Sequence, residues 1–142
     1  MNYCSACGKP VTHRNPDGDN RLRHVCDHCH TIHYQNPNIV AGVLPSHGSQ
    51  VLLCRRAIEP RRGFWTLPAG FMENGETIDQ AARRETVEEA CARVGEMRLY
   101  QLFDLPHINQ VHLFFRAELA DLDYAVGVES LEVRLFEEHE IP

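Results

Sequence analysis

The sequence predicts an α+β sandwich with a mixed sheet, preceded by a small separate module at the N-terminus. Two pairs of cysteines lie before residue 30, and five strand-like runs flank one helix-like segment further along. With 142 residues and 43% hydrophobic side chains, the chain can bury one core beside a minor module. We therefore expect a boundary at Asn36 and Pro37, with residues 1–36 as the module and residues 37–142 as the main domain.

The cysteines of the N-terminal module have the spacing of a zinc site. They form two Cys-x2-Cys pairs, Cys4 with Cys7 and Cys26 with Cys29, and two such pairs close one tetrahedral Zn²⁺ site in a zinc ribbon. An NPDGD run between the pairs predicts a turn joining two short strands. Disulfides are the alternative, which a chain without a secretory signal makes less favourable. Four histidines near the second pair could replace a cysteine as ligand: His24, His28, His30 and His33.

Five apolar runs predict the strands of the main domain. They cover residues 39–44, 51–55, 98–105, 111–118 and 132–136. A Ser-His-Gly-Ser turn joins the first two runs, and the helix-like segment separates them from the last three. Strands on both sides of one helix indicate the mixed sheet. The chain stops at Pro142, where another helix would begin, so one interpretation is that the natural chain continues.

The helix-like segment carries three acids on the side where a core is expected. At about 100° per residue, Glu85, Glu88 and Glu89 share one face with small and apolar residues. Thr77 and Gln80 form the pattern of a capping box at the start of this helix. Crowded, partly buried carboxylates take up protons unless a cation binds them, and oxygen ligands suit Mg²⁺ or Mn²⁺. The alternative is a solvated, glutamate-rich helix.

The segment from Gly70 to Ala92, GFMENGETIDQAARRETVEEACA, resembles the Nudix box, G-x5-E-x7-R-E-U-x-E-E-x-G-U, in which U is a bulky apolar residue. Six positions match in register: Gly70, Glu76, Arg84, Glu85, Glu88 and Glu89. Cys91 replaces the second glycine and Ala92 replaces a larger apolar residue, so the end of the helix departs from the pattern. The resemblance implies a Nudix α/β/α sandwich, which usually finishes with a helix that covers the sheet.

The resemblance also implies hydrolysis of a pyrophosphate bond with Mg²⁺ or Mn²⁺. Glu85 and Glu89, one turn apart, would coordinate the metal together with the carbonyl of Gly70. Glu88 would add a ligand or a water-mediated contact. A cation held there neutralises phosphate charge and makes a water molecule a better nucleophile. Arg84 is expected to face away from the metal and to pair with Glu76.

Roles outside the box are less tightly specified by the sequence. Nudix enzymes often take a general base from a later loop, so Glu129 is the preferred candidate and Glu132 the second. A solvated surface acid is the alternative for both. Arg55 and Arg56 follow a predicted strand into the loop that faces the box, so one of them is a candidate for a phosphate contact, with ordinary surface exposure as the alternative.

The N-terminal ribbon combined with WTLPAGFMENGET and GVESLEVRLF resembles the zinc-ribbon Nudix subfamily that includes a plastid FAD and ADP-ribose pyrophosphatase. This implies ADP-ribose or FAD as substrate, with release of AMP. NADH pyrophosphatases also have a ribbon, but their SQPWPFP-type motif is replaced here by LPHINQV. Hydrolysis of NADH or of an 8-oxo-dGTP type nucleotide is therefore the alternative, and a non-catalytic nucleotide-sensing regulator is a candidate from another class.

Composition limits the partners further. The formal net charge of −6 disfavours binding to a nucleic-acid backbone, so a small-molecule nucleotide is the expected partner. The chain has no apolar run of about 18 residues and no signal segment, so we expect no membrane contact and a cytoplasmic location. An organelle is the alternative if a targeting peptide precedes this sequence. The resemblance also implies a homodimer as one arrangement.

Overall fold

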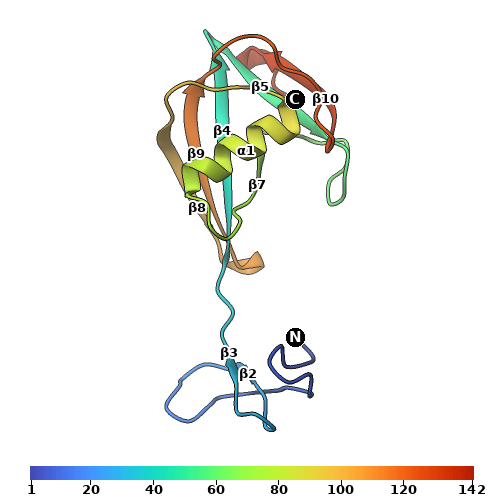
Figure 1. Cartoon of the computed structure of the whole chain (residues 1–142). Coiled ribbons are helices and arrows are strands. Elements are labelled where there is room, and N and C mark those ends of the chain that lie inside the picture. The colour runs from blue at the N-terminus through green and yellow to red at the C-terminus, as the bar shows by residue number, and fades with distance from the viewer. The chain divides into compact units, whose positions relative to one another are not determined.

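The structure, a computed structural model, describes residues 1–142 as two compact units, Met1–Asn36 and Pro37–Pro142 (Figure 1). The first unit contains a small antiparallel sheet in the order β1-β2-β3. Its strands are β1 Thr12–Arg14, β2 Arg23–Val25 and β3 Ile32–His33. The predicted hairpin around the NPDGD turn is confirmed by the β1 and β2 pairing, while β3 was not predicted.

The second unit is built on a seven-stranded sheet with the order β10-β5-β4-β9-β8, to which β6 and β7 add by pairing with β5 and β4. Strands β4 and β9 run parallel and the other neighbours antiparallel, so the predicted mixed sheet is confirmed. The strands are β4 Asn38–His47, β5 Gln50–Arg56, β6 Trp65–Thr66, β7 Ala69–Phe71, β8 Arg98–Leu105, β9 Gln110–Glu118 and β10 Ser130–Phe136.

Each of the five predicted strands is present, with ends that differ by at most three residues. Strand β4 is the centre of the sheet, and its side chains at Val40, Ala41 and Val43 are buried. This burial on successive residues is typical of a strand covered on both faces. The short strands β6 and β7 were missed because two or three residues are too few to show a period of two.

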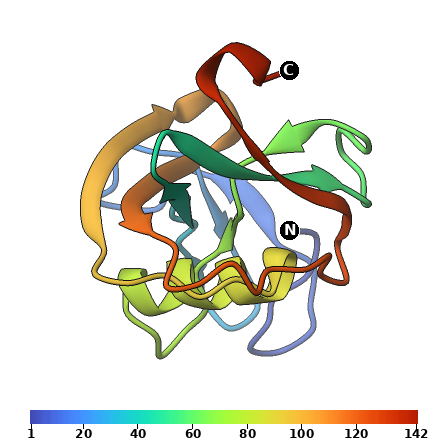
Figure 2. The same ribbon diagram turned by 90° about the horizontal axis from the view of Figure 1, so that it is seen from above.

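One α-helix, α1 Ile78–Ala90, lies across one face of the sheet (Figures 1 and 2). The capping box of Thr77 and Gln80 is present at its start, as predicted. Ala81 and Ala82 are fully buried against the sheet, since a methyl group lets the helix backbone come close. The remaining helical segments are 3₁₀ turns, η1 Pro106–Ile108 and η2 Glu138–Glu140, so α1 alone forms the helical layer. None of these helices is long and apolar enough to span a membrane.

Candidate functional site

The four cysteines of the N-terminal unit converge on one point. Their sulfur atoms all lie within 4.8 Å of one another, and none forms a disulfide. The Cys4 and Cys29 sulfurs are 3.6 Å apart, and those of Cys7 and Cys26 are 3.5 Å apart. Zn–S bonds of about 2.3 Å in a tetrahedron place sulfurs about 3.8 Å apart, whereas a disulfide needs about 2.05 Å. The donor set therefore fits Zn²⁺.

The nearby histidines do not join this set of ligand atoms. His33 comes closest, with its Nε2 atom 3.2 Å from the sulfur of Cys4. At this distance a protonated Nε2 donates a hydrogen bond to the sulfur, which is the usual role of groups around a metal–thiolate site. The backbone N–H of Ala6 also donates to Cys4, at 3.4 Å. The geometry thus favours four cysteine ligands with supporting donors.

In the second unit, α1 brings two carboxylates against the backbone of β7. Glu89 is 7% exposed, and its carboxylate accepts a hydrogen bond of 3.1 Å from the backbone N–H of Ala69. Next along β7, Gly70 lies so close to Glu85 that an added Cβ would overlap the Glu85 carboxylate. Glycine is required here because helix and strand approach closely. The sequence match at Gly70 therefore has a steric reason.

The electrostatics of these acids favour a bound cation. Burial, with the neighbouring charges of Glu85 and Glu129, raises the pKa of Glu89 to about 7, against the lowering effects of the Ala69 N–H and of Arg56. Burial also raises the pKa of Glu85. Several carboxylates thus lie close together in a partly desolvated site. A bound divalent cation would reduce their mutual repulsion and stabilise their ionised forms. Carboxylate and backbone carbonyl oxygens are the ligands that Mg²⁺ and Mn²⁺ prefer, so the donor set fits these ions.

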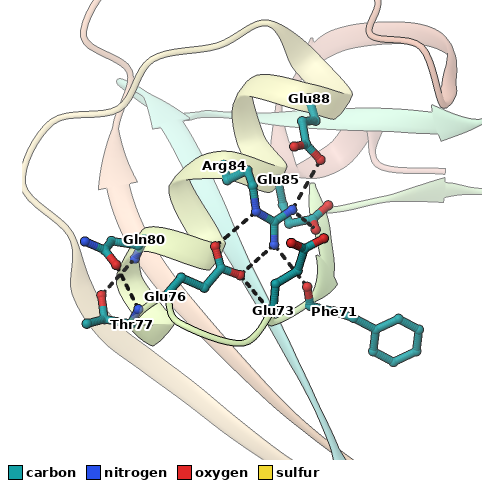
Figure 3. Close-up of polar contacts among 8 residues, drawn as sticks. All are labelled: Phe71, Glu73, Glu76, Thr77, Gln80, Arg84, Glu85 and Glu88. Atoms are coloured by element: carbon teal, nitrogen blue, oxygen red, sulfur yellow. Dashed lines mark hydrogen bonds and ion pairs between the residues drawn. The ribbon is translucent and has the colours of Figure 1, made fainter.

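Arg84 lies at the centre of a network of acids beside this site (Figure 3). Its guanidinium donates to Glu76 at 2.7 Å, to Glu85 at 2.5 Å and to Glu88 at 3.2 Å, and also to the backbone carbonyl of Phe71. Arg84 thus ties the loop before α1 to the helix, and its hydrogen bond lowers the pKa of Glu76. The expected pair with Glu76 is present. Arg84 also contacts two acids of the helix, since Glu85 is its neighbour and Glu88 lies one turn on.

Glu88 differs from the other two glutamates of the helix. Its side chain is 56% exposed and is held by Arg84, while the side chain of Glu85 is 12% exposed. Only the four cysteines form a group of three or more potential ligands close enough together to hold one ion. The carboxylates of the three glutamates lie further apart and do not form such a group. This geometry is better suited to a water-mediated contact from Glu88 than to direct coordination.

The structure separates the two candidates for a general base. Glu129 lies close enough to Glu85 and Glu89 for its charge to raise the pKa of both. Glu132 instead pairs across the strands with Arg55, with 3.8 Å between their charged groups. Of the two acids, only Glu129 therefore belongs to the acidic site.

The two candidate arginines separate in the same way. The charge of Arg56 acts on Glu89, and its Nε donates to the carbonyl of Pro60 at 2.9 Å. That bond fixes one side of the guanidinium and leaves its other donors for a ligand. Arg55 instead donates to the carbonyl of Gly63 and pairs with Glu132. Of these two arginines, Arg56 is thus the one whose charge reaches Glu89.

Three groups near this site were not predicted from the sequence. The backbone N–H of Ala69 binds Glu89, and both Gly127 and Ser130 contact the carbonyl of Glu89 through the loop before β10. Each acts through a main-chain contact, or through a hydroxyl that reaches the main chain. No spacing of residue types reports such contacts, so the sequence carried no signal for them.

Comparison with known families covers nearly the whole chain. A family model described as "NUDIX domain" matches residues 36–142, and a zinc-ribbon model described as "Nudix N-terminal" matches residues 2–35. A crystal structure of a NUDIX hydrolase from Nitrosomonas europaea superposes with a TM-score of 0.95 at 60% identity, covering 100% of this chain and 81% of that chain.

Curated relatives match over shorter shares of their own length. The "NAD-capped RNA hydrolase NudC" of Edwardsiella ictaluri is 32% identical over 127 residues, which are 88% of this chain and 45% of the relative. The human "NAD(P)H pyrophosphatase NUDT13, mitochondrial" is 35% identical over 98 residues, 69% of this chain and 26% of the relative. The chain thus spans less than half the length of these relatives.

Proposed function

The chain belongs to the Nudix family, and we propose that it hydrolyses the pyrophosphate bond of a nicotinamide dinucleotide in a reaction that depends on Mg²⁺ or Mn²⁺. The observation that carries the hydrolytic part is the pair of partly buried acids Glu85 and Glu89 against the backbone of β7, with the charge of Glu129 acting on both. A site that only senses a nucleotide needs no such group of partly desolvated carboxylates. This cluster favours an enzyme over the non-catalytic alternative.

In this proposal Glu85 and Glu89 hold the cation together with the backbone carbonyl of Gly70, and Glu88 acts through water. The bound ion supplies charge neutralisation at the phosphates and lowers the pKa of a water molecule. Glu129 accepts the proton of the attacking water. The water oxygen bonds to one phosphorus as the bridging P–O bond breaks, and the two products are AMP and the second nucleoside monophosphate. Glu129 needs no covalent role in such a reaction.

Arg56 is the proposed contact for the phosphate that lies away from the cation. Its charge lowers the pKa of Glu89, and the loop carbonyl of Pro60 already orients the guanidinium. A guanidinium presents parallel N–H donors that match two phosphate oxygens. Arg84 takes a different role, because Glu76, Glu85 and Glu88 occupy its donors. Its function is to hold the loop before α1.

The names of the relatives support the nicotinamide dinucleotide over the substrates ranked first from the sequence. Matches from Edwardsiella ictaluri and human are named for NAD-capped RNA and NAD(P)H. ADP-ribose or FAD remains the second candidate, because LPHINQV replaces the motif that marks NADH pyrophosphatases. In the structure these residues span the end of β8, the turn η1 and the start of β9. The exposed residues of η1 therefore offer a different set of side chains from that motif.

The relatives also bear on the expectation that nucleic acid is not a partner. An RNA with a 5′ NAD cap presents the same pyrophosphate as free NAD, so the chemistry proposed for Glu129 applies to both. The net charge of −6 opposes contacts along an RNA backbone. We therefore propose the free dinucleotide as the better substrate and include the capped RNA in the test.

The test is a substrate panel with the purified chain. NADH, NAD-capped RNA, ADP-ribose, FAD and 8-oxo-dGTP are compared at equal concentration with Mg²⁺ and with Mn²⁺, and products are separated by chromatography. The expected result is release of AMP from NADH at the highest rate. Highest turnover of ADP-ribose or FAD would make the second candidate correct. Binding of a nucleotide without any product would favour the sensor.

A further inference from the structure

The loop between β9 and β10 is bonded to the last turn of α1. The backbone N–H of Ala125 donates to the carbonyl of Ala90 at 2.9 Å, and that of Gly127 donates to the carbonyl of Glu89 at 3.1 Å. The Ser130 hydroxyl donates to the same Glu89 carbonyl at 2.8 Å. The last four carbonyls of a helix lack donors within the helix, and this loop supplies donors to two of them, those of Glu89 and Ala90. Figure 2 shows the orange-red segment running alongside the helix.

The contact at Gly127 is closer than any side chain permits. A Cβ added to Gly127 would overlap the carbonyl oxygen of Glu88 and the carbonyl group of Glu89. The φ of Gly127 is not in the left-handed region, so its role is close approach and not a turn that only glycine can make. Ser130 is 8% exposed, and its hydroxyl is satisfied by Glu89. Gly127 and Ser130, the two anchors of the loop, therefore both contact the C-terminal end of α1.

Glu129 lies between these two anchors. The N–H of Ser130 donates to the carbonyl of Gly127 at 3.1 Å, which closes a tight turn around Glu129. The carbonyl of Glu129 accepts from the N–H of Ala57 at 2.8 Å, which fixes the turn to the end of β5. The backbone that carries this carboxylate is thus held on both sides. One of the holding points is the carbonyl of Glu89, a residue of the acidic site itself.

We propose that Gly127 and Ser130 are positioning residues that hold the Glu129 carboxylate at a fixed place relative to Glu85 and Glu89. The inference rests on the proposed function, since it assigns the base of that reaction to Glu129. Both residues bind the main chain of Glu89. If the loop or the helix shifts, the distance between Glu129 and Glu89 is therefore expected to change little. A displacement of about 1 Å at a reacting group lowers a rate by about a hundredfold.

The variants Gly127→Ala and Ser130→Ala test this with NADH or, if it is faster, another substrate of the panel. We expect kcat to fall about 10- to 100-fold for Gly127→Ala and less for Ser130→Ala, with KM changed less than about threefold. Mn²⁺ affinity, measured by electron paramagnetic resonance without substrate, should change less than about twofold. Ser130→Thr keeps the hydroxyl and should recover most of kcat. Gly95→Ala is the matched control, because its added Cβ meets nothing nearer than 3.7 Å.

Combination with Glu129→Gln separates positioning from a general loss of structure. If Gly127 acts through Glu129, then Gly127→Ala should lower kcat less than about twofold in the Glu129→Gln background. A full, additive loss would overturn the inference, as would a loss of Mn²⁺ affinity that parallels the loss of kcat. Melting temperatures identify a variant that fails to fold, and Ser130→Ala then decides the outcome. If the wild-type chain hydrolyses no member of the panel, the proposed function falls together with this inference.

Discussion

The two candidate metal sites of this chain are built in opposite ways. In the N-terminal unit, four sulfur atoms from two short knuckles surround one point and leave no gap in the donor set. In the second unit, carboxylates from one helix lie against a strand backbone, and the side chain of Glu88 is 56% exposed beside Arg84. Four thiolates complete the coordination of an ion and indicate a structural site. Oxygen ligands that leave coordination positions free indicate an ion that also binds the substrate.

The two sites also differ in whether the fold around them depends on a bound ion. The ribbon has a sheet of three very short strands, so we expect its folded state to rely on a bound ion. The second unit buries a core between α1 and the sheet, which includes Ala41, Val43, Leu52 and Phe115. That core holds the acids in place whether or not a cation is bound. Loss of the metal should therefore unfold the first unit and only inactivate the second.

The substitution Cys26→Ser should give the largest effect of this kind. Zn²⁺ contributes about 10–16 kcal/mol to the folding of small zinc modules, and a serine hydroxyl is a poor ligand for it. We expect residues 1–36 to lose protection in hydrogen exchange, while α1 and β4 keep theirs. Zinc content, measured by mass spectrometry, should fall from one ion per chain to none. Cys54→Ser is the control. A ribbon that stays protected without zinc would refute the comparison.

The substitution Glu89→Gln should remove hydrolysis while it leaves the fold intact. The amide can still accept the hydrogen bond from Ala69, but it removes the charge that a cation needs, and cation stabilisation of several kcal/mol at the transition state corresponds to at least about a hundredfold in kcat. Circular dichroism should be unchanged. Glu96→Gln, an exposed acid beside Arg98, is the control and should keep wild-type activity. Equal activity of both variants would mean that Glu89 is not a ligand.

Much of this architecture could be predicted because it is written in local patterns. The cysteine spacing indicates the ribbon, and the acids at positions 85, 88 and 89 indicate the face of α1. The capping box at Thr77 marks the start of that helix correctly. These signals work because each depends on residues within one or two helical turns, or on one short loop.

The unpredicted parts depend on contacts between distant segments. The sequence left open whether Glu88 binds the ion directly or through water, and its exposed side chain beside Arg84 favours the contact through water. Glu129 was already preferred over Glu132, but the reason that Glu132 is unsuitable, its place opposite Arg55, comes from the pairing of β10 with β5. Neither result follows from spacing along the chain.

The pH dependence of the free energy of unfolding should report the cost of ionising buried Glu89 in the metal-free protein. The folded pKa of Glu89 is raised from 4.5 to about 7, so the folded state holds this proton more tightly than the unfolded state does. Its stabilisation is full below about pH 4.5 and is lost as pH rises to about 7, by at most about 3 kcal/mol. Urea unfolding in EDTA at several pH values measures this.

The variant Glu89→Gln isolates this contribution, because an amide does not titrate. His112 contributes a slope of opposite sign, since burial lowers its pKa and its neutral form is favoured in the folded state. The difference between wild type and Glu89→Gln cancels that slope. Mg²⁺ added at pH 8 should restore stability to the wild type and leave the variant unchanged. A pH-independent difference between the two proteins would contradict the buried-acid description.

The smallest predicted effect concerns Cys91, a cysteine that serves neither site. It ends α1 with a φ of +48°, the left-handed conformation that glycine adopts without cost, and its side chain is exposed. The strain of a side chain there is about 1 kcal/mol, and the greater entropy of glycine in the unfolded chain offsets part of it. We expect Cys91→Gly to raise the free energy of unfolding by about 0.5 kcal/mol. Zinc content and kcat should not change, since the residue lies past the last carboxylate.

The reverse change at another left-handed position, Gly75→Ala, should destabilise the protein. A loss of stability in Cys91→Gly would mean that the thiol makes a contact that outweighs its backbone strain.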